Sequence, residues 1–121
     1  MQATSLAPRA SIALAILGSM EGKSRPTHPP EIEDISGLLF KLHEANIDIG
    51  DVSLRRVPGG FYSEDVETLV GHYLGSGYAR KMSPVRFTEK GLELLRKIIA
   101  QEKEANRDAV ENAARILGLG V

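Results

Sequence analysis

The stretch PGGFYSEDVETLVGHYLGSGYARKMSPVRFTEKGLELLRKII, residues 58–99, decides the fold, because turn residues divide it into a helix, a tight strand pair and a second helix. After the Gly-Gly pair, Ser63 can accept hydrogen bonds from the free amides of a first helical turn. Three carboxylates follow in the turn where the helix dipole favours negative charge: Glu64, Asp65 and Glu67. Apolar residues then recur at helical spacing until a Gly-Ser-Gly breaker, so we expect a helix from Ser63 to Leu74.

Two short strand-like segments follow this predicted helix. Tyr78–Arg80 and Val85–Phe87 flank a Lys-Met-Ser-Pro turn, which predicts a hairpin. The hairpin leads to Thr88, the predicted N-cap of the next helix. A third alternating run, residues 52–57, is expected to join the hairpin in a three-stranded antiparallel sheet, because an isolated two-stranded ribbon is only marginally stable.

Two further helices are predicted in the first part of the chain. Residues 5–20 are apolar on nearly every side, which is typical of a helix surrounded by others. The short apolar run after Arg9 has the outline of a signal peptide, but no small-x-small cleavage site follows it, and we expect a buried helix instead. A proline-rich loop, residues 21–30, precedes a second amphipathic helix that ends near Ala45.

The C-terminal part of the chain has the longest helical pattern, residues 88–117. As one helix it would extend about 45 Å, so its second half must break away or find another surface. Asn106 or Asp108, within the charged run 101–108, could cap a new helix there. We therefore predict one domain over residues 1–100 and a helical extension over residues 101–121.

An apolar stripe on this extension is the predicted dimerisation element. Its members are Ala109, Val110, Ala113, Ile116 and Leu117. An exposed stripe of this kind would leave apolar surface in water, and a homodimer would cover it. The alternative is that the segment folds back on the first helix of its own chain.

The composition narrows the range of functions. A chain of 121 residues with 42 % apolar residues suits one core of ordinary size. It contains no cysteine, which excludes disulfides and thiol catalysis, and its three histidines lack the close spacing of a metal site. The glycine pairs also lack the pattern of a phosphate loop. We expect a cytoplasmic protein that is not an enzyme and has no cofactor, no metal and no membrane segment.

Any binding of nucleic acid must depend on a local cluster of cations, because the net charge is only −1. Five cations are expected along one edge of the predicted sheet: Arg80, Lys81 and Arg86 on the hairpin, and Arg55 and Arg56 on the neighbouring strand. Lys and Arg on an exposed hairpin suit phosphate contacts, whose affinity falls with salt. The alternative is a solvated hairpin whose charges prevent aggregation at the sheet edge.

Three motifs carry a resemblance to a known class of protein. Gly60-Phe-Tyr-Ser-Glu-Asp-Val, Gly77-Tyr-Ala and Phe87-Thr-Glu-Lys-Gly-Leu-Glu-Leu-Leu resemble winged-helix proteins of the PadR and MarR class. The wider order, with Leu38-Leu39-Phe40-Lys-Leu before the Gly-x-Tyr-Ser helix start, is similar to the Panacea antitoxin-like family. The resemblance implies an α+β, mostly α, winged-helix fold. The long connection 46–62 departs from the short turn that joins the two helices in many helix-turn-helix proteins.

Two functions are compatible with these observations. The first is a small transcriptional regulator that contacts double-stranded DNA mainly through its basic wing, since the carboxylates at the start of the helix 63–74 would repel phosphates. The second is a winged-helix protein-interaction module, antitoxin-like or part of an assembly, that binds no DNA. It would offer Glu64, Asp65 and Glu67 to a basic partner. The clustered wing cations favour the first function, and the near-neutral charge favours the second.

Overall fold

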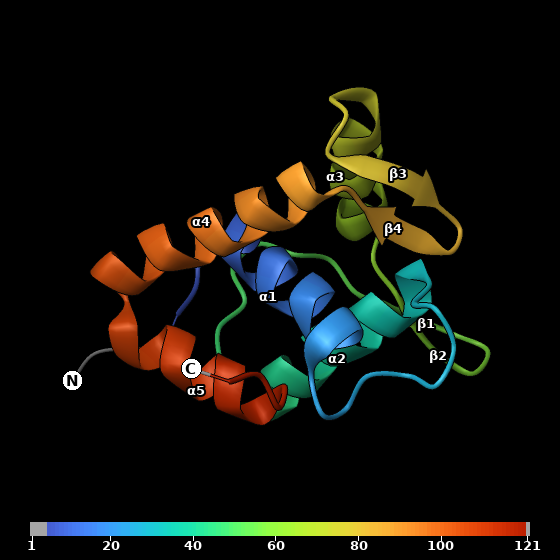
Figure 1. The fold of residues 1–121 in the computed structure, drawn as a ribbon. Helices are drawn as coiled ribbons and strands as arrows, with labels where there is room; N and C mark the ends of the chain where they lie inside the picture. The colour runs from blue at the N-terminus through green and yellow to red at the C-terminus, as the bar shows by residue number, and fades with distance from the viewer. Residues whose placement is uncertain (1–4, 121) are drawn as a thin grey trace.

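The computed structural model describes residues 5–120, which form five helices and two short hairpins (Figure 1). In chain order the elements are α1 (Pro8–Glu21), α2 (Ile32–Glu44), β1 (Arg55–Val57), β2 (Gly60–Tyr62), α3 (Glu64–Gly75), β3 (Ala79–Met82), β4 (Val85–Phe87), α4 (Glu89–Ala105) and α5 (Arg107–Ile116). The predicted class, α+β and mostly α, is confirmed. No helix among the described residues is long and apolar enough to span a membrane.

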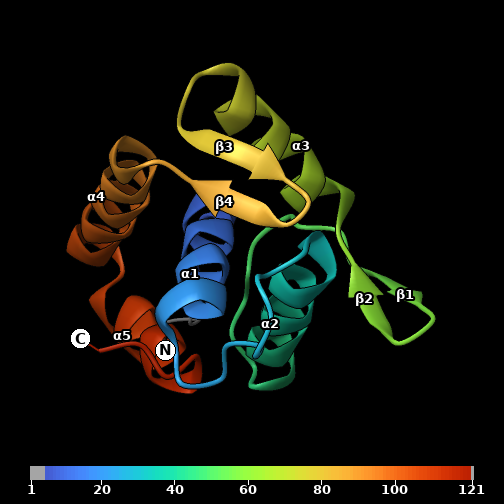
Figure 2. The same cartoon turned by 45° about the vertical axis from the view of Figure 1, so that its right-hand side comes forward.

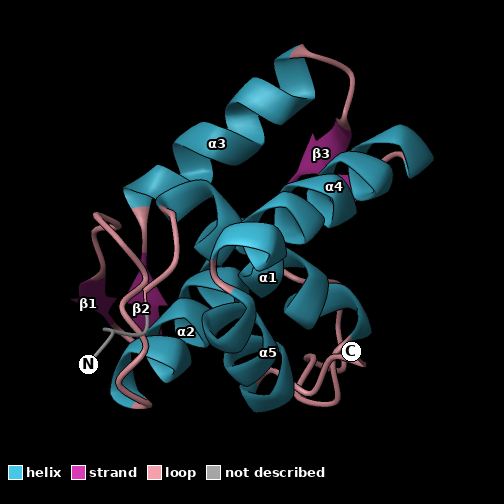
Figure 3. Cartoon of the chain, turned by 90° about the vertical axis from the view of Figure 1, so that its left-hand side faces the viewer, coloured by secondary structure: helices cyan, strands magenta, loops and turns pink. Residues whose placement is uncertain are grey.

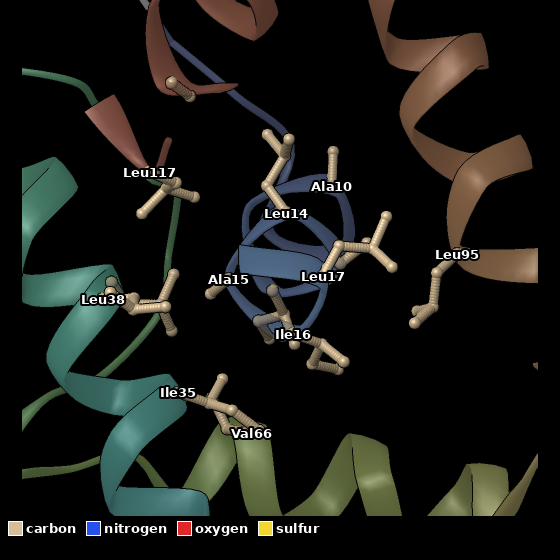
Figure 4. Close-up of a cluster of buried hydrophobic side chains, with 14 of the residues drawn as sticks. Ala10, Leu14, Ala15, Ile16, Leu17, Ile35, Leu38, Val66, Leu95 and Leu117 are labelled. Atoms are coloured by element: carbon tan, nitrogen blue, oxygen red, sulfur yellow. The ribbon is translucent and has the colours of Figure 1, made fainter. Parts of the chain in front are cut away.

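Helix α1 is the centre of the core. Its residues are buried without interruption from Ala10 to Ser19, as its all-round apolar pattern predicts. In Figure 4, Leu38 of α2, Val66 of α3 and Leu95 of α4 surround α1 from different sides, and Leu117 approaches it from the C-terminal segment. The buried hydroxyl of Ser11 donates a hydrogen bond of 2.8 Å to the carbonyl of Ile49. This bond satisfies a polar group inside the core and fastens the segment after α2 to α1.

Both predicted caps of the central stretch are confirmed. The Ser63 hydroxyl accepts a hydrogen bond from the Val66 amide, and the Thr88 hydroxyl accepts one from the Gly91 amide. The first turn of α4 also lies directly on the base of the second hairpin. A Cβ at Gly91 would overlap the carbonyl oxygen of Tyr78, so a residue without a side chain allows this close approach.

The predicted three-stranded sheet is wrong. β1 pairs with β2, with Arg55 opposite Tyr62, and β3 pairs with β4 in a separate ribbon. The turn of the first ribbon contains Gly59 at φ +88, a backbone conformation that favours glycine. Because a ribbon of this size is weak alone, each one is supported by a helix: β2 packs on α2, and β3 packs on α3 (Figure 2).

The second ribbon makes one backbone hydrogen bond with the segment that precedes α2, and none of its strands pairs with residues 52–57. The Val85 amide donates a hydrogen bond of 2.8 Å to the carbonyl of Pro30. The hairpin is therefore joined to the loop between α1 and α2. Residues 55–57 instead form β1 and pair with β2 in the first ribbon.

The long C-terminal pattern breaks at Asn106, and α5 folds back across α1 and α2 (Figure 3). Four members of the predicted dimerisation stripe are buried within the chain, namely Ala109, Val110, Ala113 and Leu117, and Ile116 is half-buried. The premise that this stripe lies exposed is wrong, because α1 needs a cover on the side that α5 occupies. Within the extension predicted for residues 101–121, apolar residues between positions 109 and 119 share one hydrophobic core with the preceding residues.

The burial of Leu117 predicts a large loss of stability for Leu117→Ala. Leu117 is 0 % exposed, so the substitution should lower the free energy of unfolding by about 2–5 kcal/mol, because it leaves a cavity in the core. Urea denaturation followed by circular dichroism measures this change. Leu74→Ala is the matched control, since Leu74 is 40 % exposed and its truncation should cost much less. Equal costs for the two variants would contradict the placement of the C-terminal segment.

Candidate nucleic-acid interface

The two faces of the β3–β4 hairpin differ in chemistry. The inner face consists of apolar side chains that are buried or half-buried against the core: Ala79, Met82, Val85 and Phe87. The outer face carries the three predicted hairpin cations, Arg80, Lys81 and Arg86, and all three are exposed. The hairpin thus presents a basic surface to solvent and an apolar surface to α3 and the core.

A β-bulge produces this separation. Ala79 lies opposite Phe87 and Lys81 lies opposite Arg86, so two steps along β3 match one step along β4. In a regular strand, Ala79 and Met82 would point to opposite faces, because they are three positions apart. The extra residue lets both of them face the core, and Arg80 and Lys81 remain together on the outside. The bulge therefore gathers all three cations on one face.

The electrostatics of this outer face favour an anionic ligand. Among the described residues, Arg80, Lys81 and Arg86 form no ion pair with a carboxylate. Lys81 and Arg86 are direct cross-strand neighbours, and like charges in such positions repel each other. A phosphate group placed between them would offset this repulsion and accept charge-assisted hydrogen bonds.

Arg55 and Arg56 lie on the other hairpin and have local partners. The Arg55 Nε lies 3.6 Å from a Glu64 carboxylate oxygen, and its guanidinium carbon lies 5.1 Å from the centre of the Tyr62 ring. The Arg56 guanidinium carbon lies 5.1 Å from the centre of the Phe61 ring. No strand ladder joins this hairpin to β3–β4. The predicted group of five cations is therefore divided: the three on β3–β4 have no ion-pair partner among residues 5–120, and the two on β1 contact Glu64 and aromatic rings.

The carboxylates at the start of α3 also have neighbours in their own chain. Asp65 accepts hydrogen bonds from the Ser53 amide at 2.7 Å and from the Ser53 hydroxyl at 2.9 Å. Partial burial first, and then the adjacent Glu67 carboxylate, raise the pKa of Tyr62 above its ordinary value of 10.0. Together with the pair between Glu64 and Arg55, these contacts hold the first hairpin and residue 53 against the start of α3.

Aromatic side chains near the two hairpins lie in packed positions. Phe61 stacks on Phe40, with ring centres 3.8 Å apart, beside a cleft of about 380 Å³ between α2 and residues 48–54. Tyr73 is buried in edge-to-face contact with Tyr78 and Phe87 beneath the β3–β4 hairpin. The Phe40–Phe61 stack thus holds the first hairpin on α2, and the Tyr73 ring holds the second hairpin on α3. Among residues 5–120, no cluster of His, Asp and Glu could hold a metal ion.

One cation near the basic hairpin is missed by the sequence reasoning. The Lys90 amino group lies 5.5 Å from the centre of the Tyr78 ring, and Tyr78 directly precedes β3. Lys90 is exposed in the first turn of α4. The spacing of residues along the sequence does not predict this contact, because the place of Lys90 beside Tyr78 depends on the direction in which α4 continues from β4. The Thr88 cap next to it is the only local signal that the sequence offers.

No protein-family model, curated protein or solved structure matches this chain. The resemblance to winged-helix regulators therefore remains an expectation that rests on short sequence motifs. The function has to be inferred from the geometry of the site itself.

The environment of Tyr62 predicts a specific loss of stability at alkaline pH. Because the pKa of Tyr62 is raised in the folded chain, the unfolded chain releases this proton first as the pH rises. The stabilising contribution of Tyr62 is therefore complete below about pH 10, the pKa of this side chain in the unfolded chain, and it is lost as the pH rises toward the higher pKa of the folded chain. Urea denaturation at a series of pH values should show a steeper fall above about pH 10 for the wild type than for Tyr62→Phe. Parallel curves for the two proteins would contradict this assignment.

Proposed function

We propose that this chain is a winged-helix DNA-binding protein, a small transcriptional regulator whose wing is the β3–β4 hairpin. The observation that carries the proposal is the outer face of this hairpin, where a bulge places Arg80, Lys81 and Arg86 together without carboxylate partners among the described residues. Such a face suits the phosphates of duplex DNA, and its contacts would be sequence-independent.

The position of α3 supports the same proposal. α3 packs along β3, so the helix and the basic hairpin lie together at one end of the molecule (Figure 1). Beyond its acidic first turn, α3 exposes Thr68 and His72, which are not acids and would not repel phosphates. A duplex could meet the wing and this part of α3 together. The wing would provide most of the affinity, because the cations lie there.

The competing function, a protein-interaction module that uses Glu64, Asp65 and Glu67, has less support. Arg55 pairs with Glu64, and Ser53 donates two hydrogen bonds to Asp65, so two of the three carboxylates already have partners in the chain. A homodimer remains a prediction. Because the stripe of α5 is buried, this folded monomer would have to form such a dimer through another surface.

The proposal predicts two effects when Arg80, Lys81 and Arg86 are replaced together by alanine. The affinity for DNA should fall, and the remaining affinity should depend less steeply on salt concentration. Each phosphate contact adds about 0.9 to the slope of log affinity against log salt, so three lost contacts should lower it by about three. Fluorescence anisotropy of a labelled random duplex, titrated at several salt concentrations, measures both the affinity and the slope.

The matched control replaces Lys97, Arg107 and Arg115 by alanine, which changes the net charge equally. These exposed cations lie on α4 and α5, and α5 is at the other end of the molecule from the hairpin (Figure 1). The control should keep the wild-type slope. If the two triple variants had equal effects, the binding would depend on net charge alone and not on the hairpin. An unchanged slope in the hairpin variant would exclude the hairpin as the contact with DNA.

A further inference from the structure

The turn of the basic hairpin is fastened to the segment that precedes α2. The Ser83 hydroxyl donates a hydrogen bond of 2.8 Å to a carboxylate oxygen of Glu31, and the Val85 amide donates one of 2.8 Å to the Pro30 carbonyl. Ser83 and Val85 lie on both sides of Pro84 in the turn, whereas Pro30 and Glu31 are neighbours at the start of α2. Two hydrogen bonds from a distant part of the chain therefore meet at one hairpin turn.

Glu31 is well suited to act as a fixed anchor. Its backbone amide donates a hydrogen bond of 2.8 Å to the Asp34 carboxylate, which fixes Glu31 as the residue that caps α2. The next residue, Ile32, is buried, and Ile35 one turn later is fully buried in the core. His28 contacts the same Asp34 oxygen at 3.1 Å, so the loop between α1 and α2 is part of this arrangement.

The hairpin needs such an anchor at its turn. At its base, the Thr88 amide and hydroxyl both donate hydrogen bonds to the Tyr78 carbonyl, and α4 continues directly from there. Along its length, β3 packs on α3. A two-stranded ribbon held in this way can still twist at its free end, and the repulsion between Lys81 and Arg86 adds to this tendency. The bonds to Pro30 and Glu31 restrict that motion.

We infer that Glu31 and Ser83 form a latch that positions the wing for DNA, an inference that rests on the proposed function. Glu31 is a positioning residue, because its carboxylate would be repelled by phosphate and acts on the hairpin through the Ser83 hydroxyl. The loop 22–31 and the wing then behave as one unit. The latch orients the face that carries Arg80, Lys81 and Arg86 without adding a contact to the duplex.

The test compares Ser83→Ala, Glu31→Ala and Glu31→Gln with the wild type. Ser83→Ala should weaken binding of a random duplex about two- to tenfold, the effect of one lost hydrogen bond, and leave the slope against salt unchanged. It should also speed hydrogen exchange at the Val85 amide. Glu31→Ala removes both the acceptor and the negative charge, so it should bind the duplex more weakly than Glu31→Gln, which removes the charge alone. The double variant should bind no more weakly than Ser83→Ala, because both changes remove the same contact. Glu31→Gln keeps an acceptor oxygen and removes a negative charge, so it should bind at least as tightly as the wild type.

Ser24→Ala is the matched control, since it removes a serine hydroxyl that contacts Lys41 from the same loop and does not touch the hairpin. Wild-type affinity in Ser83→Ala would overturn the positioning role, whether or not the exchange at Val85 changes. A loss in Glu31→Gln as large as in Glu31→Ala would also overturn it. Absence of duplex binding by the wild type at low salt would overturn the proposed function, and exchange at Val85 would still report whether the latch holds the turn.

Discussion

The rest of the structure depends on one constraint, the need to cover a helix that is apolar on all sides. Ten consecutive residues of α1, from Ala10 to Ser19, are buried, and a helix of this kind is stable in water only when other elements surround it. α2, α4 and α5 contact it directly. The break at Asn106 follows from this need, because a straight continuation of α4 would leave one side of α1 in water. The same requirement places the apolar stripe of α5 inside the monomer.

The two hairpins pack on the outside of the helices, β2 on α2 and β3 on α3. Each depends on its helix, because neither ribbon is large enough to be stable alone. The two hairpins are supported in different ways, and their cations therefore have different surroundings. On β1, Arg55 and Arg56 lie over the rings of Tyr62 and Phe61 and help to hold the first hairpin in place. On β3–β4, the apolar inner face provides the support, so the outer cations have no carboxylate partner in the part of the chain that the structure describes. These cations, rather than the net charge of −1, form the basis of the proposed DNA contact.

The basic hairpin is also joined to the loop between α1 and α2. Pro30 and Glu31 join the hairpin turn to a helix cap that is anchored in the core. Long-range hydrogen bonds of this kind restrict the angle of a surface element without contributing to its chemistry. Through these bonds, the packing around α1 and α2 would affect where a duplex meets the cations.

The sequence by itself determined the local elements. Ser63 and Thr88 cap the helices that were predicted to start there, the hairpin between them is present, and the chain breaks within its charged run. These features depend on hydrophobic spacing and on hydrogen bonds within a few residues, so the local sequence contains enough information. It also placed three of the five site cations on one hairpin. Only the tertiary structure decided the strand partners of residues 55–57, the burial of Leu117, and the separation of Arg55 and Arg56 from the β3–β4 hairpin. Such choices between distant partners depend on which surfaces remain to be covered after the helices pack, and the spacing of residues along the chain does not encode them.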